Sequence, residues 1–225
     1  PYEFPALRVA HSTVSLPVPV GMWRSVGHSL QAFFVESLLD EIAVATGQDP
    51  VALRLSLLAA HPRARHVLTE VAERSGWGKP LAPWSDGQPR ARGIALHASY
   101  GTTVAEVAEV SLSPEGQIRV HRVVAVMDCG FPVNPDSIVQ QIEGGIIYGL
   151  SAALHGEITI EQGRAVPGNF DTYRALRLSE CPAIEAHVVR SMEEPSGVGE
   201  PSLPPIAPAV ANALYKLTGV RVRTL

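Results

Sequence analysis

The chain has 225 residues, of which 46% are hydrophobic and 18% charged, with a formal net charge of -4 and a pI near 6.1. This composition is typical of a soluble folded protein and allows one large domain or two small ones. Neither lysine nor arginine forms a run, which disfavours nucleic acid and anionic membranes as partners. No stretch of about eighteen apolar residues and no signal-peptide pattern occurs, so we expect no membrane span.

The chain begins with Pro1 inside a strand-like passage, residues 4–20, and we interpret it as part of a longer protein. Its two cysteines, Cys129 and Cys181, are too few and too far apart for a zinc or iron-sulfur site. A single bridge between them cannot be decided from the sequence. The simpler interpretation is that both are buried free thiols.

Three helices are predicted in the first third of the chain. Residues 28–47 carry apolar side chains at helical spacing and end at a glycine; these side chains are Leu30, Phe33, Phe34, Leu38, Ile42 and Ala45. Residues 49–61 begin with Asp49 as the N-cap and Pro50 in the first turn. Pro62 opens the third helix, which closes at Gly76.

The pattern then changes to strands, so the predicted fold class is α+β, with helices at about 28–76 followed by a mixed β-sheet within residues 91–225. Strands are expected at 91–101, 103–116, 117–130 and 183–190, with a hairpin turn at residues 114–116. Two further helices are expected at 135–156 and 204–219. Glu106 and Glu109 are expected on the solvated face of a strand. We treat 1–225 as one domain, without repeats or linkers.

One acid, Glu200, stands in a segment that restricts its backbone closely, "EEPSGVGEPSLPP" at residues 193–205. Gly197 and Gly199 permit main-chain angles closed to other residues, and Pro201 holds Glu200 extended. The proline-rich helix start that follows would present N–H groups to an anion. A carboxylate aimed in this way suits a general base. A surface turn is the commoner origin of such a pattern, and the residues alone do not exclude it.

A second candidate lies in the predicted helix at 135–156. Gln141 stands one helical turn before Gly144 and Gly145, so its amide and a bare backbone patch share one face. An amide offers donors and an acceptor that match the edge of a nitrogen heterocycle. A tight helix crossing that uses the glycines for close approach explains the same pattern.

A third candidate is the stretch "VPVGMWRSVGHS" before the first helix. Gly21 and Gly27 bracket Met22, Trp23 and Arg24 there. The simpler interpretation is a helix entry loop with a buried tryptophan.

Taken together and in this order, the three stretches resemble the C-terminal part of the molybdopterin-binding large subunit of the molybdenum hydroxylases, the xanthine dehydrogenase/aldehyde oxidase family. "GMWRSVGHSLQAFFVESLLDEIA" is similar to that family's glycine-bracketed aromatic-Arg segment and "MDCGFPVNPDSIVQQIEGGIIYGL" to its Gln-x-x-Gly-Gly helix. "SGVGEPSLPPIAPAVANAL" is similar to its Gly-Glu-Pro loop. The resemblance covers nearly the whole chain and points to the bacterial branch of isoquinoline 1-oxidoreductase and aldehyde dehydrogenase.

The resemblance implies an oxidoreductase that hydroxylates an N-heterocycle or aldehyde carbon with water-derived oxygen. Glu200 would be the catalytic base. The residues that would contact the cofactor are Gln141, Gly144 and Gly145, the main chain at Met22, Trp23 and Arg24, and Ser196 with Gly197. No side chain would ligate the metal, which the cofactor itself holds. Val26 stands where purine-oxidising relatives have a phenylalanine, so stacking of a purine is not expected.

The resemblance also implies a cofactor and partners. The cofactor would be molybdenum-molybdopterin in its cytosine dinucleotide form, bound in the full-length enzyme and absent from this fragment alone. The N-terminal half of the same subunit would supply two further glycine-rich cofactor loops, and a small [2Fe-2S] subunit would take the electrons. The compartment would be the cytoplasm or periplasm of a bacterium.

Two other functions stay open from the residues. A non-catalytic domain could keep the fold for structural support or for holding a partner, although an acid in the setting of Glu200 argues against a scaffold. A self-contained hydrolase using Glu200 and a histidine would need a nucleophile motif such as Gly-x-Ser-x-Gly, which the chain lacks.

Overall fold

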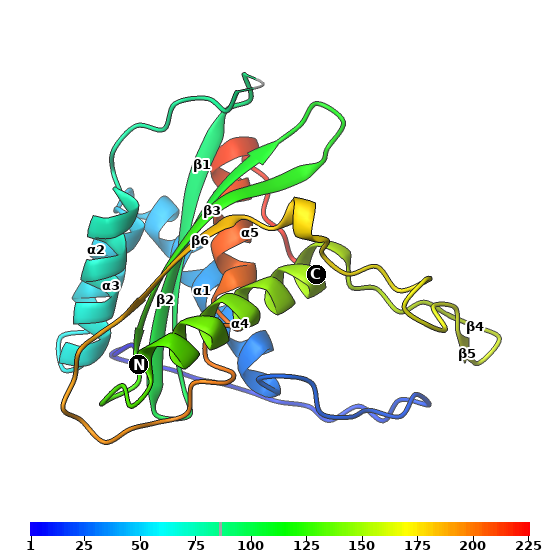
Figure 1. Ribbon diagram of the computed structural model, residues 1–225, viewed down its shortest axis with the longest axis horizontal. Coiled ribbons are helices and arrows are strands. Elements are labelled where there is room, and N and C mark those ends of the chain that lie inside the picture. Colours follow the sequence, from blue (N-terminus) through cyan, green and yellow to red (C-terminus); the bar gives the residue numbers. More distant parts are fainter. Residues whose placement is uncertain (86) are drawn as a thin grey trace.

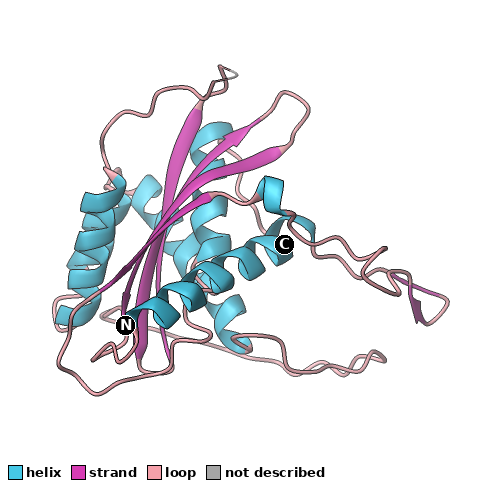
Figure 2. Ribbon diagram, viewed as in Figure 1, coloured by secondary structure: helices cyan, strands magenta, loops and turns pink. Residues whose placement is uncertain are grey.

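A four-stranded mixed sheet with helices on both faces forms the centre of the computed structural model, which describes residues 1–85 and 87–225 (Figures 1 and 2). Its order is β1-β2-β3-β6, antiparallel except for the parallel pair β3 and β6. The bounds are β1 (Arg90–Ser99), β2 (Thr102–Leu112), β3 (Ile118–Asp128) and β6 (Ala183–Val188). The predicted α+β class, with helices before a mixed sheet, is confirmed.

The helices are α1 (Gly27–Ala45), α2 (Pro50–Ser56), α3 (Pro62–Ser75), α4 (Pro135–His155) and α5 (Ile206–Thr218). Asp49 caps α2 by accepting hydrogen bonds from two backbone N–H groups, and Gly76 ends α3 in the left-handed conformation. The second helix is shorter than the predicted 49–61. Beyond Ser56 the chain turns more tightly, because the N–H of Leu58 bonds the carbonyl three residues back.

Two apolar clusters fix the layers. On one face of the sheet, α3 packs Val67, Leu68 and Val71 against the strands. On the other face, α4 and α5 pack residues such as Ile142 and Ile206 against them. Every residue of β2 except the last is buried, because helices cover this central strand on both sides. No helix in the described part of the chain is long and apolar enough to cross a bilayer.

Helix α5 lies unusually close to strand β1 at Gly93. A Cβ atom built there would be 2.0 Å from the carbonyl oxygen of Ala209 and 2.4 Å from the backbone nitrogen of Ala213. Beside this crossing, the buried side chain of Asn212 donates to the carbonyls of Ile94 and Glu36. The missing side chain at Gly93 therefore sets the distance between α5 and the sheet.

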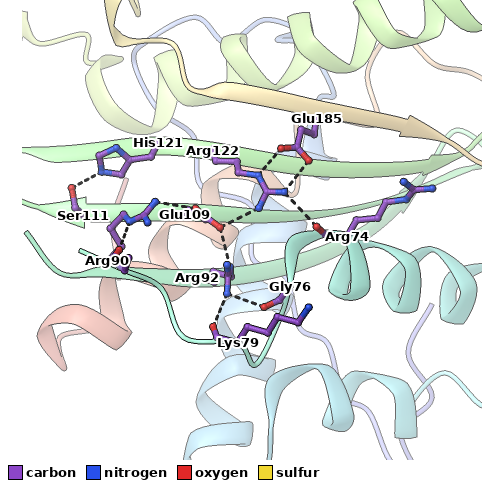
Figure 3. A network of polar contacts seen from close by, with 11 residues as sticks. Arg74, Gly76, Lys79, Arg90, Arg92, Glu109, Ser111, His121, Arg122 and Glu185 are labelled. Atoms are coloured by element: carbon purple, nitrogen blue, oxygen red, sulfur yellow. Dashed lines mark hydrogen bonds and ion pairs between the residues drawn. The ribbon is translucent and has the colours of Figure 1, made fainter. Parts of the chain in front are cut away.

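The prediction that Glu106 and Glu109 face solvent is wrong, because both are buried in β2. Glu109 accepts hydrogen bonds from Arg90, Arg92 and Arg122, and Arg122 also forms a bidentate pair with Glu185 (Figure 3). Glu106 has no hydrogen-bond partner among the described residues. Burial raises the pKa of Glu106 well above its usual value, because a carboxylate loses its hydration there.

The N-terminal passage also differs from expectation. Residues 4–20 form no strand and are mostly exposed, with three prolines that remove backbone donors. They project from the sheet, as does the short hairpin of β4 (Ile160–Glu161) and β5 (Arg164–Ala165) (Figure 1). Of the two free thiols, Cys129 is buried as expected and Cys181 is only half-buried.

Helix α1 buries two acids and leaves half of its predicted apolar stripe exposed. Glu36 and Asp40 are buried and pair with Arg54 and Arg221. Phe33 of the predicted stripe is buried, whereas Leu30, Phe34 and Leu38 are 63%, 62% and 56% exposed. Arg54 bonds both the carboxylate and the carbonyl of Glu36, and Tyr2 donates to the same carboxylate. These pairs set the rotation of α1 about its axis.

Replacing Arg54 with methionine tests the buried pair. We expect the free energy of unfolding to fall by about 3–5 kcal/mol, because Glu36 would stay buried without its partner charge. Urea titration of the chain measures the loss. The matched control is Arg223→Met, which breaks an exposed pair with Glu41 on the same helix and should cost less than about 1 kcal/mol. Equal losses in the two variants would contradict the assignment.

Replacing Gly93 with alanine tests the crossing of α5 over β1. The added methyl would overlap backbone atoms that cannot rotate away, so we expect a loss of about 3 kcal/mol in the free energy of unfolding. Gly144→Ala serves as the control, since a methyl there meets nothing and should raise helix stability by up to about 1 kcal/mol. A Gly93→Ala variant as stable as the parent would disprove the close approach.

Candidate active site

The side chain of Arg24 joins the three segments singled out in the sequence. Its Nε donates to the carbonyl of Gly199 at 2.8 Å, and its Nη2 donates to the same carbonyl and to Oε1 of Gln141 at 3.2 Å. These partners lie 175 and 117 residues away along the chain. One guanidinium thus connects the entry loop of α1, the first half of α4 and the loop that carries Glu200.

The carboxylate of Glu200 is held by the residue next to Arg24. The backbone N–H of Ser25 donates to Oε1 of Glu200 at 2.8 Å, and the hydroxyl of Ser25 donates to the Glu200 carbonyl at 2.8 Å. Ser25 is fully buried, and both it and Val26 have positive φ, 69° and 40°. Positive φ at a non-glycine residue costs about 1–3 kcal/mol and concentrates at functional sites. The strained backbone turns this N–H toward the carboxylate.

The loop before Glu200 is tied down by the sheet. Thr102 at the start of β2 donates to the carbonyl of Gly197 at 2.6 Å and bonds the hydroxyl of Ser196 at 2.7 Å. Ser196 also bonds the carbonyl of Cys129 through both its N–H and its hydroxyl. Ser196 and Gly197 therefore have packing roles in this fold, and their contact with a cofactor stays a prediction.

Tyr100 occupies the turn between β1 and β2 beside this loop. Its carbonyl accepts the N–H of Gly197 at 3.2 Å, and its φ of 53° is positive. Partial desolvation, the charge of Glu200 and a hydrogen bond to that carboxylate raise the pKa of the Tyr100 phenol. The ring of His28 meets Tyr100 edge-on at a centroid distance of 5.1 Å. A fourth segment thus contacts the loop that carries Glu200.

His28 also bonds His97, with Nδ1 and Nε2 3.0 Å apart. Burial, and then the charge of His28, lower the pKa of His97 to about 4. His97 is therefore neutral at physiological pH.

The two glycines of α4 lie in different surroundings. A Cβ at Gly145 would be 2.1 Å from the hydroxyl oxygen of Ser202, so this glycine permits α4 to pack against the segment after Glu200. A Cβ at Gly144 would meet nothing, and this backbone is exposed. Gln141 is exposed too, and its Nε2 has no partner among the residues that the structure describes. Gln141 and Gly144 thus present donors and bare backbone at the surface.

Met22 and Trp23, which were also predicted to contact the cofactor, lie at the surface. Met22 is exposed, and Trp23, which the simpler interpretation had buried, is 39% exposed and packs on Tyr148 of α4 at 5.2 Å between ring centroids. The start of α5 differs from expectation, because residues 201–206 are all buried. Its first N–H groups therefore do not face an open anion site.

Sequence reasoning did not identify Ser25 as a donor to Glu200, nor the bracing by Tyr100, Thr102 and Cys129. The one local signal was the Tyr-Gly pair between two strands, which marks a turn without showing what the turn contacts. No group of three or more His, Cys, Asp or Glu side chains suited to a metal ion occurs across residues 1–85 and 87–225. A hollow of about 730 Å³ lies elsewhere, lined by Trp84 and His121, and shares no residue with these loops.

Comparison with known proteins identifies the family. The model of the molybdopterin cofactor-binding domain matches residues 59–182, more than half of the chain. The beta chain of isoquinoline 1-oxidoreductase from Brevundimonas diminuta is 36% identical over 225 residues, all of this chain and 29% of that protein. The B component of nicotinate dehydrogenase from Pseudomonas putida is 33% identical over 239 residues, all of this chain and 20% of that protein.

A solved structure shares the fold. Aldehyde oxidoreductase from Desulfovibrio gigas superposes with a TM-score of 0.68 at 13% identity, over 91% of this chain and 40% of that one. The chain spans less than a third of the length of the two curated relatives. On the family match and the whole-chain similarity to these relatives, the chain belongs to the molybdopterin cofactor-binding domain family of molybdenum hydroxylase large subunits.

Proposed function

We propose that this chain contributes the catalytic base to a molybdenum hydroxylase that oxidises an N-heterocycle or an aldehyde with water-derived oxygen. The observation that carries the proposal is the carboxylate of Glu200, held by the N–H of Ser25 in a loop that Arg24 links to Gln141. The names of the relatives support the substrate class, since two refer to N-heterocycles and one to an aldehyde.

The residues around Glu200 fit a pterin cofactor. The Nε2 of Gln141 and the exposed backbone at Gly144 would meet a ring edge that carries acceptors, and the main chain at Met22, Trp23 and Arg24 would lie near the metal's ligands. When bound, molybdenum-molybdopterin supplies a two-electron acceptor and a Lewis acid that activates water. We propose the cytosine dinucleotide form, as the resemblance to the isoquinoline branch implies.

The chain's own residues would position and receive a proton. Glu200 would accept the proton that water must lose before its oxygen attacks carbon, a role that general bases perform. Ser25 fixes one carboxylate oxygen, which lies 2.8 Å from its backbone nitrogen. Arg24 would hold Gln141 and the loop of Glu200 at a fixed distance from each other, so that the distance between the base and the cofactor stays constant.

A non-catalytic domain explains these features less well. Ser25 and Val26 both have positive φ, which is unfavourable for residues other than glycine. This strained backbone occurs where the N–H of Ser25 binds the carboxylate of Glu200. A supporting domain would gain nothing from such strain. The catalytic proposal gives the strain a purpose.

We propose two partners. The rest of the same subunit would cover the exposed stripe of α1 and the adjoining apolar groove of about 420 Å³, lined by Trp23, Phe34 and Leu203 among others. A small [2Fe-2S] subunit would take the electrons, and the complex would work in the bacterial cytoplasm or periplasm.

Replacing Glu200 with glutamine in the full-length complex tests the base. We expect molybdenum content to be intact and kcat/KM to fall by about 10²–10⁴-fold, because the amide cannot accept the proton. Steady-state oxidation of isoquinoline, nicotinate and aromatic aldehydes, with metal analysis of the same samples, measures both. Glu194→Gln, an exposed acid on the same loop, is the control and should behave like the parent. Parental turnover by the Glu200 variant would reject the base.

Metal analysis tests the division of the cofactor site. The 225-residue chain produced alone should contain no stoichiometric molybdenum, since the other cofactor loops are proposed to lie elsewhere in the subunit. The full-length subunit from the same host should contain it at near one atom per subunit. Stoichiometric molybdenum in the isolated chain would show that its own residues suffice.

A further inference from the structure

We propose that residues 13–22 form an edge strand that pairs with a sheet in the remainder of the subunit, and that this pairing fixes the approach of the chain to Arg24 and Ser25. The inference rests on the proposed function, in which the chain works as part of a longer subunit. The partner is an exposed sheet edge with an apolar layer beneath it.

The N-terminal passage makes no backbone hydrogen bond of its own. Across residues 4–22, no N–H or carbonyl bonds any other residue that the structure describes. Its two ends are nonetheless fixed, since the N–H of Glu3 donates to the carbonyl of Leu57 at 2.8 Å and Trp23 packs on Tyr148. Figure 1 shows the passage leaving the body of the molecule and returning to α1. A connection of this length without secondary structure is uncommon in a compact domain unless it binds something.

Residues 13–22 alternate strictly between apolar side chains and small or polar ones. In an extended chain, every second side chain points to the same face. One face of this segment therefore carries Val14, Leu16, Val18, Val20 and Met22, all of which are exposed. The other face carries Thr13, Ser15, Pro17, Pro19 and Gly21. Such alternation is typical of a strand with one buried face, which this segment acquires only against a partner.

The two prolines determine which edge of this strand can pair. In a strand, the N–H and the carbonyl of one residue point to the same edge, and successive residues alternate between the two edges. Pro17 and Pro19 stand two residues apart, so the donors that they lack are missing from one edge only. The opposite edge keeps the N–H groups of Leu16, Val18 and Val20. The segment can therefore join a sheet on one side only, as edge strands that contain proline do.

The remainder of the subunit is the partner that fits these features. The two curated relatives match this chain over its whole length, yet the chain spans only 29% and 20% of them. In a subunit of that length, most of the protein lies outside these residues and can supply a sheet edge. The exposed side chains of α1, Leu30, Phe34 and Leu38, follow closely along the chain. One partner surface would cover both the segment and the helix.

Pairing of the segment would act directly on the site. Met22 ends the segment, and three residues later the N–H of Ser25 binds Oε1 of Glu200 at 2.8 Å. Arg24, between them, donates to the carbonyl of Gly199. Pairing with a sheet removes backbone freedom from the residues that lead into these contacts. The remainder of the subunit thereby fixes the direction from which the main chain reaches Arg24 and Ser25.

Hydrogen exchange of single backbone amides tests the pairing. In the full-length complex, we expect the N–H groups of Leu16, Val18 and Val20 to exchange at least about 100-fold more slowly than in an unfolded chain. Those of Ser15 and Gly21, on the other edge, should exchange at close to the unfolded rate. Mass spectrometry with fragmentation inside the peptides resolves these amides, and strand β3 serves as the protected reference. Unprotected amides at Leu16, Val18 and Val20, or protection of Ser15 and Gly21 instead, would overturn the proposal.

A pair of proline substitutions tests the choice of edge. Leu16→Pro removes a donor from the pairing edge, whereas Ser15→Pro removes one from the edge that Pro17 and Pro19 already leave incomplete. In the full-length complex, we expect Leu16→Pro to speed exchange at Val18 and Val20 by at least about tenfold, and Ser15→Pro to change it by less than about twofold. Equal effects of the two substitutions would overturn the edge assignment. If Leu16→Pro yields no folded complex, the exchange pattern of the parent decides.

Two further outcomes separate the partner from the proposed function. Slow exchange of the segment in the 225-residue chain alone, with the mass of a dimer by light scattering, would overturn the proposal, because a second copy would then supply the edge. Exchange is measured without turnover, so a failure of the strand leaves the base untouched. Parental turnover by Glu200→Gln would reject the base and leave the exchange result standing.

Discussion

The close crossing of helix α5 over strand β1 at Gly93 determines where the loop that carries Glu200 lies relative to the sheet. With no side chain there, the carbonyl of Ala209 can approach the strand far more closely than any other residue would permit. The helix begins soon after Glu200, and residues 201–206 between them are buried, so the height of α5 above the sheet fixes where the loop ends. Thr102 anchors the other side of the loop. Glu200 is therefore held between a helix and a strand whose separation one glycine sets.

Helix α1 positions Ser25 and Arg24, the residues just before it, through acids buried on its inner face. Its inward acids, Glu36 and Asp40, pair with Arg54 and Arg221, and buried pairs of this kind tolerate only one orientation. That orientation sends Ser25, just before the helix, to the carboxylate of Glu200. Phe33 and Leu39 are buried on the same helix, while Leu30, Phe34 and Leu38 remain exposed. Charge pairs and apolar contacts thus hold α1 against the rest of the chain, and further apolar contact remains available on its exposed face.

The sequence was sufficient for the main helices and for the strands of the large sheet, because those signals are local. Asp49 with Pro50, Gly76 and the turn at 114–116 each act within a few residues, and the helices and hairpin follow them. The alternation of apolar and polar residues wrongly placed Glu106 and Glu109 on a solvent-facing side of their strand. Such alternation identifies a solvent-facing side only when one face of the sheet is open to water. The contacts of Glu200 could not be predicted, because Ser25 and Arg24 lie 175 residues from their partners and no local pattern encodes that distance.

The long arm that carries β4 and β5 projects away from the sheet, and the site lies in the body of the molecule (Figure 1). Cleaving the chain within residues 156–177 would divide it into a piece bearing Arg24, Tyr100 and Gln141 and a piece bearing Glu200. Parallel pairing of β3 with β6 and the packing of α5 on β1 would still hold the pieces together. We therefore expect the geometry of the site not to depend on covalent continuity in the arm, and the two fragments to reassemble as a complementation pair.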